Sequence, residues 1–351
     1  SCRRNPPRPR AAGVVPPAGN AHIRRQTHHS TADSDTQEVI RYLSEPMIIG
    51  VDHGFAAMKT AHSAFPSGLV EFEHEPYTQA NVLEYGGKYY IAGSGRQPLQ
   101  KDKTQREDYY LLTLAAIARE LAFRHAERTA CVHLAGGLPL TSFGRGKKTF
   151  KAYLFREGRP VSFRYEGLDY TVTITDVSLF PQGYAAVLTQ PGLLDEPSVL
   201  VADIGGWTVD LMRLDNRVPD AASCRSLELG MIRCLDAIAE QVRHTLGLSL
   251  TPAQIESVLR NDVSRLDEQV KNLIHREADR YVRLLLSAIT ESGLDPRAMP
   301  AVFLGGGAAL LKTHFPTDAG LFQPILLDDV CLNAKGYERL ATQLTQITHG
   351  K

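Results

Sequence analysis

One stretch near the middle of the chain constrains the fold most. Residues 198–211 read SVLVADIGGWTVDL: an apolar run ends in Asp203, glycines follow at positions 205 and 206, and a second apolar run begins shortly after them. A short apolar run that is bounded by turn-forming residues is typical of a buried strand. The pattern therefore predicts a strand, a tight turn and a second strand, with Gly205 and Gly206 turning the backbone at positive φ.

This turn also suggests a chemistry. Successive backbone N–H groups in a tight turn can point at one spot, a geometry that holds phosphate oxygens. The carboxylate of Asp203 beside the turn suits a magnesium ion or its water shell. The alternative is an ordinary hairpin with an aspartate at its turn, because aspartate and glycine are common turn residues. The stretch by itself leaves both interpretations open.

A second copy of the pattern favours the phosphate-binding interpretation. Residues 47–61 read MIIGVDHGFAAMKTA, in which an apolar strand ends in Asp52, Gly54 follows two residues later, and a strand resumes. Two hairpins of the form strand–Asp–x–Gly–strand imply two related halves. Such halves could grip a phosphate chain from both sides.

Composition limits the class of protein. The chain has 351 residues, of which 43% are hydrophobic and 22% are charged, as expected for a soluble globular protein of about two domains. The formal net charge of +0 gives no general attraction to nucleic acid or to an acidic membrane, so we expect direct binding to neither. No apolar run approaches the roughly 18 residues that a membrane span needs. The cysteines are scattered without a Cys-x-x-Cys pair, which favours reduced thiols in a cytosol over a disulfide framework or a zinc site.

The first 46 residues differ from the rest. Residues 1–46 are rich in arginine and proline and poor in large apolar side chains. Such a segment cannot bury enough surface to offset the entropy of ordering, so we expect it to be disordered. Met47 is the first methionine and stands at the start of the first predicted strand. We expect the native protein to begin at or near Met47, with the leader as upstream sequence or a cloning remnant. An organelle transit peptide, which is also arginine-rich, is the alternative.

Periodicity and turn residues predict the other elements. The Gly-Gly pair at 86–87 predicts a hairpin turn, and the Thr-Pro-Ala-Gln sequence at 251–254 predicts a capping box that starts a helix. The basic segment 144–156 is interpreted as a solvated helix face. The remaining expected elements are strands at 69–72, 131–135, 161–165, 170–175 and 226–230, and helices at 107–128, 231–244, 264–291 and 333–347.

Three glycines follow another apolar run. Residues 300–304 predict a strand, and Gly305, Gly306 and Gly307 come directly after it, before a helix. Their lack of side chains would let a flat ligand lie on the backbone. A packing device at a helix start is the alternative interpretation.

The order of these motifs resembles the actin-like ATPase superfamily. The two hairpins are followed by connectors: the first ends in Pro-Gln-Gly at 181–183, and the second is Asn-Ala-Lys-Gly at 333–336, after the triple glycine. Within the superfamily the chain is most similar to the bacterial plasmid-segregation actins of the ParM/StbA family. That family also tends to show Gly-Leu-Pro-Leu before a basic segment, as at 137–151 here. The resemblance covers nearly all of residues 47–348.

The resemblance implies a fold and its division into domains. The expected fold is α/β: the actin-like ATPase fold, with two related ribonuclease-H-like domains and a nucleotide cleft between them. Domain I would comprise residues 47–182, with 328–351 returning to it. Domain II would comprise residues 183–327.

The resemblance also implies the site residues. The family's motifs place Gln182, Asp203 and Asp52 in catalysis, with Gln182 orienting the attacking water. Asp52 and Asp203 would hold Mg²⁺ through water, and the nucleotide would be ATP, with GTP as the alternative. Residues matching the nucleotide-binding motifs are Asp52, Gly54, Lys59, Asp203, Gly205, Gly206, Thr208, Gly305, Gly306 and Gly307.

Three positions depart from the family pattern. His53 replaces a more usual Asn or Asp. The segment Phe55-Ala56-Ala57 lacks the hydroxyl that is common after the first glycine, so the backbone must carry more of the phosphate contact. Trp207 is bulkier than the usual residue, and we expect it in the core.

The function implied by the resemblance is ATP hydrolysis coupled to filament assembly. Such filaments would separate low-copy plasmids through a DNA-binding adaptor protein bound to a centromere-like site. One alternative is a small-molecule, sugar-type kinase, which would need a carboxylate base and a sugar pocket; the sequence assigns neither. A chaperone would normally need an added substrate-binding domain. A cell-shape or organising actin homologue is a further alternative.

Overall fold

The structure is a computed structural model, and it describes residues 45–95, 102–316 and 324–349. The chain separates into a unit of residues Ser1–Ser44 and a compact unit of residues Glu45–Lys351, and only the second is described here. The expected disorder of residues 1–46 therefore falls almost wholly outside the described residues. None of the helices in the described ranges has the length and apolarity that crossing a membrane requires.

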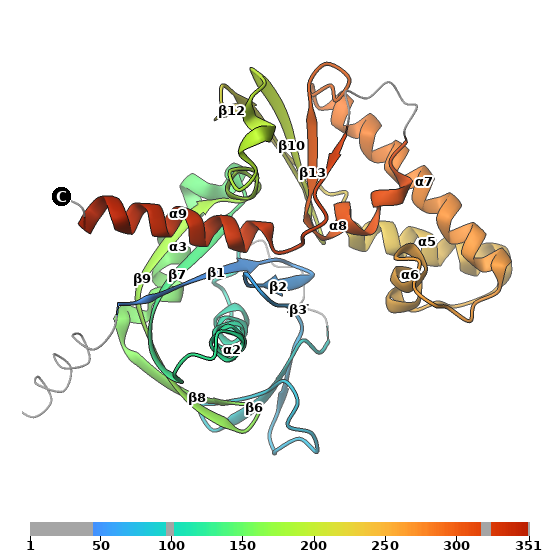
Figure 1. Ribbon diagram of the computed structural model, residues 1–351. Helices are drawn as coiled ribbons and strands as arrows, with labels where there is room; N and C mark the ends of the chain where they lie inside the picture. Colours follow the sequence, from blue (N-terminus) through green and yellow to red (C-terminus); the bar gives the residue numbers. More distant parts are fainter. Residues whose placement is uncertain (1–44, 96–101, 317–323, 350–351) are drawn as a thin grey trace, which may run out of the picture. The chain divides into compact units, whose positions relative to one another are not determined.

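A nine-stranded sheet forms the first half of the compact unit (Figure 1). Its order is β3-β2-β1-β7-β9-β8-β5-β6-β4, and its middle strands β1, β7 and β9 are parallel. The strands are β1 (Met47–His53), β2 (Ala57–Lys59), β3 (Ala64–Pro66), β4 (Leu69–Phe72), β5 (Val82–Tyr85), β6 (Lys88–Ala92), β7 (Thr129–Leu138), β8 (Pro160–Tyr165) and β9 (Leu168–Pro181).

A five-stranded sheet follows, in the order β12-β11-β10-β13-β14. Its middle strand β10 pairs antiparallel with β11 and parallel with β13, so the Asp203 hairpin and the strand before the triple glycine are direct neighbours. The strands are β10 (Ser198–Ile204), β11 (Val209–Asp215), β12 (Val218–Leu227), β13 (Ala301–Leu304) and β14 (Ile325–Leu326).

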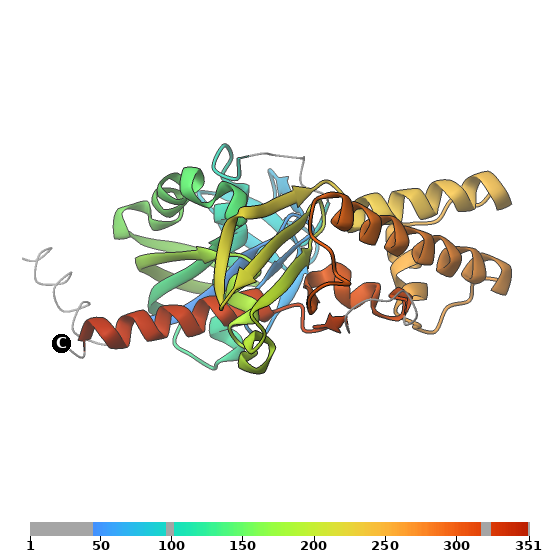
Figure 2. The same ribbon diagram turned by 90° about the horizontal axis from the view of Figure 1, so that it is seen from above.

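Helices cover the sheets and build their cores. Buried apolar side chains of α2 pack with those of the first sheet, and those of α5, α6 and α7 pack with the second. Figure 2 shows α5, α6 and α7 extending together beyond the second sheet. The helices are α2 (Asp108–Phe123), α3 (Leu140–Phe155), α4 (Tyr184–Val187), α5 (Met231–Leu246), α6 (Pro252–Leu259), α7 (Glu268–Glu291), α8 (Gly305–Leu310) and α9 (Leu332–His349), with short 3₁₀ turns η1 (Arg156–Gly158), η2 (Pro191–Leu194) and η3 (Lys312–His314).

The last helix, α9, returns to the first sheet and lies against β1 and α4. Two glycines allow this close approach. A Cβ added to Gly50 would lie 2.0 Å from the carbonyl oxygen of Ala334, and one added to Gly336 would lie 2.2 Å from that of Ala185. The start of α9 is thereby fixed between the two sheets, which places Asn333 beside Asp203.

Several predicted elements are confirmed. The turn at Gly86-Gly87 has both glycines at positive φ. Thr251 and Gln254 form the capping box at the start of α6. Helices α5 and α7 and the triple-glycine strand–helix junction also lie where the sequence places them, within a few residues.

Other element boundaries were wrong. The strand expected at 131–135 runs through the glycines to Leu138, and the residues expected to form a connector after Thr175 continue β9 to Pro181. Both extensions arise because β7 pairs with β1 on one side and β9 on the other. The helix expected at 107–128 ends at Phe123, and the strand expected at 226–230 begins at Val218. Pairing between distant segments sets the ends of the strands, and local sequence does not show this pairing.

Candidate nucleotide site

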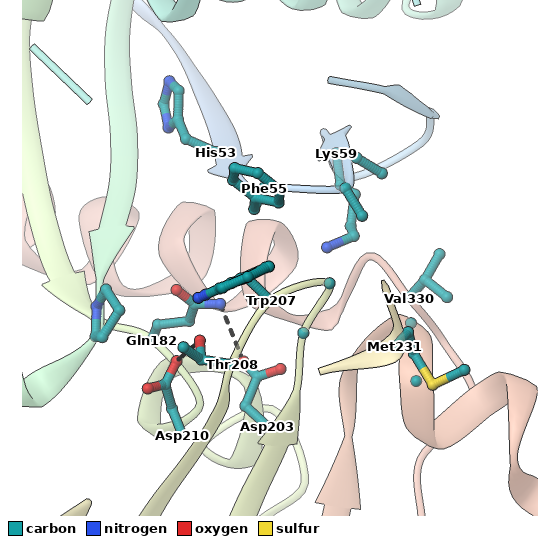
Figure 3. A pocket seen from close by; sticks show the side chains of 18 of the residues that line it. His53, Phe55, Lys59, Gln182, Asp203, Trp207, Thr208, Asp210, Met231 and Val330 are labelled. Atoms are coloured by element: carbon teal, nitrogen blue, oxygen red, sulfur yellow. Dashed lines mark hydrogen bonds between the residues drawn. The ribbon is translucent and has the colours of Figure 1, made fainter. Parts of the chain in front are cut away.

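A cavity of about 910 Å³ lies where the two Asp-x-Gly hairpins face each other. Its size is within the range of about 300–1,000 Å³ that is usual for ligand and cofactor sites. Residues of both hairpins, of the connector at Gln182 and of the α8 glycines line it. Figure 3 shows Phe55 and Lys59 of the first hairpin opposite Asp203 and Trp207 of the second.

The tips of the two hairpins touch. A Cβ added to Gly206 would lie 2.5 Å from the Cβ of Ala56, so only glycine fits at this contact. Gly205 and Gly206 do not have positive φ, and the expectation that they turn the backbone in that region was wrong. The reason for glycine at position 206 is the approach of the other hairpin.

Asp203 lies at the centre of a small hydrogen-bonded cluster. Its buried carboxylate accepts at Oδ2 from Gln182 Nε2 at 3.2 Å and from Asn333 Nδ2 at 2.8 Å. Asn333 Oδ1 in turn accepts from the backbone N–H of Gly183 at 2.9 Å. We call Gln182, Gly183, Asp203 and Asn333 the Asp203 cluster. It joins the second hairpin to both connectors.

The surroundings of the Asp203 cluster disfavour a negative charge on Asp203. Burial, with the nearby charge of Asp52, raises the pKa of Asp203 from 3.8 to about 6. The donors Gln182 and Asn333 are neutral amides, so they provide hydrogen bonds without a positive charge. The site therefore favours the arrival of a cation near Asp203.

The first hairpin supplies an ion pair. Asp52 and Lys59 are opposite each other in the register of β1 and β2, and Lys59 Nζ lies 2.9 Å from Asp52 Oδ2. Burial alone would lower the pKa of Lys59, but the Asp52 carboxylate beside it raises the pKa above its usual value. Lys59 and Gly54 line the cavity, whereas Asp52 is not among its lining residues.

The three glycines after β13 have different structural reasons. Gly305 has a φ of 90°, and a Cβ there would lie 2.5 Å from Asp203 Oδ1. A Cβ on Gly307 would lie 2.2 Å from Ile204 Cγ2. Gly306 lines the cavity and has no atom within 4 Å of its Cβ position. Close packing therefore explains the glycines at positions 305 and 307. At position 306 the absence of a side chain leaves open space on the cavity wall.

Thr208 lines the cavity but its hydroxyl turns to a neighbouring carboxylate. Thr208 Oγ1 donates to Asp210 Oδ2 at 3.2 Å, and Ser226 Oγ donates to Asp210 Oδ1 at 2.6 Å (Figure 3 shows the first bond). Burial raises the pKa of Asp210. Thr208 thus orients a second buried carboxylate beside the site.

The residues that depart from the family pattern have distinct places. His53 is buried, its Nε2 lies 2.9 Å from Thr113 Oγ1, and burial lowers its pKa to about 3, so it is a neutral residue of the cavity wall. Trp207, expected in the core, is half-buried and lines the cavity. Its ring centroid lies 6.0 Å from that of Phe55.

Sequence reasoning missed two residues of the site. Asn333 was identified as part of the second connector, but nothing in the sequence showed that its amide reaches Asp203. Lys103 follows the 82–92 hairpin in no recognisable motif, yet it lines the cavity and its Nζ donates to the carbonyl oxygen of His53 at 2.5 Å. Only the folded chain brings either residue to the hairpins.

The donor set fits a hydrated magnesium ion. Among the described residues there is no group of three or more His, Cys, Asp or Glu side chains arranged to hold a metal directly. Asp203 and Asp52 repel each other, as the raised pKa of Asp203 shows, and a divalent cation near them would relieve this repulsion. Mg²⁺ usually keeps several waters and needs only one or two carboxylates.

The comparisons with known proteins agree with this architecture. The profile of the family described as actin-like proteins N-terminal domain matches residues 50–184. No curated protein sequence matches the chain significantly. Among solved structures, Ta0583, an archaeal actin homolog in complex with ADP, superposes with a TM-score of 0.67 at 20% identity, covering 85% of this chain and 99% of that chain.

Structures of ParM proteins and of Alp12 superpose similarly. The apo psk41 ParM protein has a TM-score of 0.64 at 18% identity, with 87% of this chain and 100% of that chain covered. Bacillus thuringiensis ParM with ATP has a TM-score of 0.62 at 15% identity over 87% and 100% of the two chains. The Alp12 filament structure has a TM-score of 0.61 at 14% identity over 86% and 100%.

These findings define the class of the protein. The chain has the actin-like fold, and the predicted resemblance to the actin-like ATPase superfamily is confirmed. More particularly, its first half matches the actin-like N-terminal family, and structures of ParM proteins are among those similar to the whole of the compact unit.

Proposed function

We propose that the chain is an ATP-hydrolysing actin-like protein whose nucleotide-dependent filaments segregate plasmid DNA. The observation that carries the proposal is the Asp203 cluster. The buried carboxylate of Asp203 faces the cavity and accepts hydrogen bonds from Gln182 and Asn333 of the two connectors. A change in the bound nucleotide can therefore affect both connectors and, through them, both sheets. In this proposal, the first sheet with α9 is domain I, the second sheet is domain II, and the cavity is the nucleotide cleft.

The proposed chemistry is positioning and electrostatic stabilisation, as is usual for phosphoryl transfer. Asp52 and Asp203 hold Mg²⁺ through water, and Lys59 contributes positive charge at the first hairpin. When bound, Mg²⁺ offsets the negative charge of the phosphates. Gln182 has a neutral amide, so it cannot act as a strong base, but its carbonyl oxygen can accept from a water and fix its orientation toward the terminal phosphate. Gly306 leaves room for the adenosine.

Self-association and an adaptor complete the proposal. One similar structure is a filament of Alp12, and others are ParM proteins with ATP or AMPPNP, which supports assembly linked to ATP, with GTP as the alternative nucleotide. The near-neutral net charge favours contact with DNA through an adaptor protein at a centromere-like site rather than direct binding. The proposed location is the bacterial cytoplasm.

Light scattering and phosphate release, recorded together on the full chain, test the proposal. We expect scattering to rise on addition of Mg²⁺ with ATP and to decay as phosphate is released, with no second substrate present. The Asp203→Asn protein is the matched negative control. A sugar-type kinase would show neither change without its acceptor, and such a result would refute the filament function.

Plasmid segregation has a separate test. A low-copy plasmid that carries the gene for the protein together with its adaptor gene and centromere-like site should be retained over generations, whereas the same plasmid with Asp203→Asn should be lost at the rate of random partition. Equal retention of the two plasmids would contradict the segregation role while leaving assembly to the scattering experiment.

A further inference from the structure

Lys103 differs from the other lysine of the cavity by having no carboxylate partner. Lys59 is paired with Asp52 at 2.9 Å. In the part of the chain that the structure describes, no carboxylate lies within ion-pair distance of Lys103 Nζ, which bonds only the carbonyl oxygen of His53 and lies 5.5 Å from the ring centroid of Tyr109. The ammonium group is thus held at the cavity by a neutral acceptor and an aromatic face.

The surroundings of Lys103 disfavour the positive charge of its ammonium group. Burial lowers the pKa of Lys103, and the charges of Asp52 and Asp210 only partly oppose this effect. Other groups that face it are Lys59, which repels it, and the neutral His53. A half-buried cation without a counter-ion is the arrangement expected where an anionic ligand completes the pairing.

The position of Lys103 selects one part of the ligand. Its bonded carbonyl belongs to the last residue of β1, directly before Gly54 at the tip of the first hairpin. At this tip the segment Phe55-Ala56-Ala57 offers no hydroxyl to a phosphate oxygen. The opening beside Gly306 lies on the other half, next to β13 and α8. An anion at Lys103 therefore corresponds to the phosphate end of a nucleotide and not to its base.

We propose that Lys103 binds the terminal phosphate of a nucleoside triphosphate and sets the preference of the site for the triphosphate over the diphosphate. This inference rests on the proposed nucleotide site. A charge-assisted bond from the ammonium group replaces the hydroxyl contact that the first hairpin lacks. The diphosphate has no group at that position, so its binding relies on Lys59 and the backbone of the hairpins.

Binding measurements on Lys103→Met and Lys103→Gln test the proposal. Isothermal titration with the Mg²⁺ complexes of AMPPNP and ADP gives both dissociation constants, and the fluorescence of Trp207, which is the sole tryptophan, gives an independent signal. We expect AMPPNP affinity to fall roughly 10- to 100-fold. ADP affinity should stay within about twofold, so that the ratio of the two constants moves toward one. Retained ADP affinity also shows that each variant is folded.

Lys88→Met is the matched control, because Lys88 is an exposed lysine that pairs with Glu71 away from the cavity. It should leave both constants unchanged. Equal loss of AMPPNP and ADP affinity in the Lys103 variants, or no loss of either, would overturn the role of Lys103. If the unaltered protein binds neither nucleotide, the proposed function itself fails, and the two failures are thereby distinguished.

Discussion

At the scale of single residues, the structure places most of the predicted site residues at one cavity and leaves their roles as predictions. Asp203, Gly54, Lys59 and Gln182 line the cavity, whereas Asp52 is not among its lining residues. The reasons for the glycines could not be predicted, because they depend on contacts with the other hairpin or the next strand. Asn333 belongs to the second connector motif and Lys103 to no recognised motif, and only tertiary packing brings the two side chains to the site.

The raised pKa of Asp203 leads to a prediction about stability. The folded protein holds the Asp203 proton up to about pH 6, whereas the unfolded chain releases it near 3.8. The folded state therefore loses stability as pH rises through this window, by on the order of 3 kcal/mol at neutral pH. Asp203→Asn should raise the Tm of the nucleotide-free protein at pH 7.5 and lose Mg²⁺–ATP turnover. The gain in Tm should shrink as pH approaches 4.

Thermal unfolding across pH checks this prediction. The control is Asp236→Asn, an exposed aspartate on α5, which should not change the pH profile. A Tm that falls at pH 7.5 in Asp203→Asn would show that the carboxylate stabilises the nucleotide-free fold, contrary to the argument from burial.

A second prediction concerns hydrolysis. Gln182→Ala removes the amide proposed to orient the water, and loss of such positioning typically costs about 10²–10⁴ in rate. Removing its bond to Asp203 should cost only about 1 kcal/mol of stability. ATP affinity should change little, so filaments should form and persist. Phosphate release and filament lifetime are measured on one sample, with Gln269→Ala at an exposed position of α7 as the control. A rate equal to that of the unaltered protein would end the catalytic role of Gln182.

At the scale of elements, local signals were reliable where the chain turns and unreliable where strands end. The Gly86-Gly87 turn and the Thr251 capping box depend on neighbouring residues alone, and both were predicted correctly. The length of β7 and β9 depends on their pairing with each other, which sequence periodicity does not contain. The same reasoning distinguishes the three glycines at the start of α8, which look identical in sequence.

Alanine substitutions can distinguish those glycines. Gly306→Ala meets no atom of the protein and gains helix propensity of up to about 1 kcal/mol, so Tm should hold or rise while nucleotide affinity falls. Gly307→Ala places Cβ 2.2 Å from Ile204 Cγ2, so Tm should fall. Thermal unfolding and ADP titration of both variants provide the comparison. Undiminished ADP affinity in Gly306→Ala would remove position 306 from the adenosine contact.

At the scale of the whole molecule, the Asp203 cluster is the place where the two sheets and both connectors meet. Gln182 and Gly183 directly follow β9 of the first sheet. Asp203 lies near the end of β10 in the second sheet, and Asn333 lies in the first turn of α9, the helix that returns to the first sheet. The order of motifs predicted two hairpins and two connectors, and it did not say where the connectors lie relative to Asp203. The hydrogen bond from Asn333 to Asp203 could not be predicted, because it depends on how one side-chain amide at the start of α9 packs against the second sheet.

Asn333→Ala tests whether this amide links the halves. The substitution leaves the Gly183 N–H without its acceptor and removes a donor from Asp203, and each buried group left unsatisfied costs about 1–3 kcal/mol. We expect the free energy of unfolding, measured in urea, to fall by about 2–4 kcal/mol. Mg²⁺–ATP should restore part of the loss, because a cation near Asp203 replaces the missing donor. Asn272→Ala, at an exposed position of α7, should leave stability almost unchanged. If the two variants unfold alike, the amide does not hold the halves together, and the coupling between nucleotide and sheets must run through Gln182 alone.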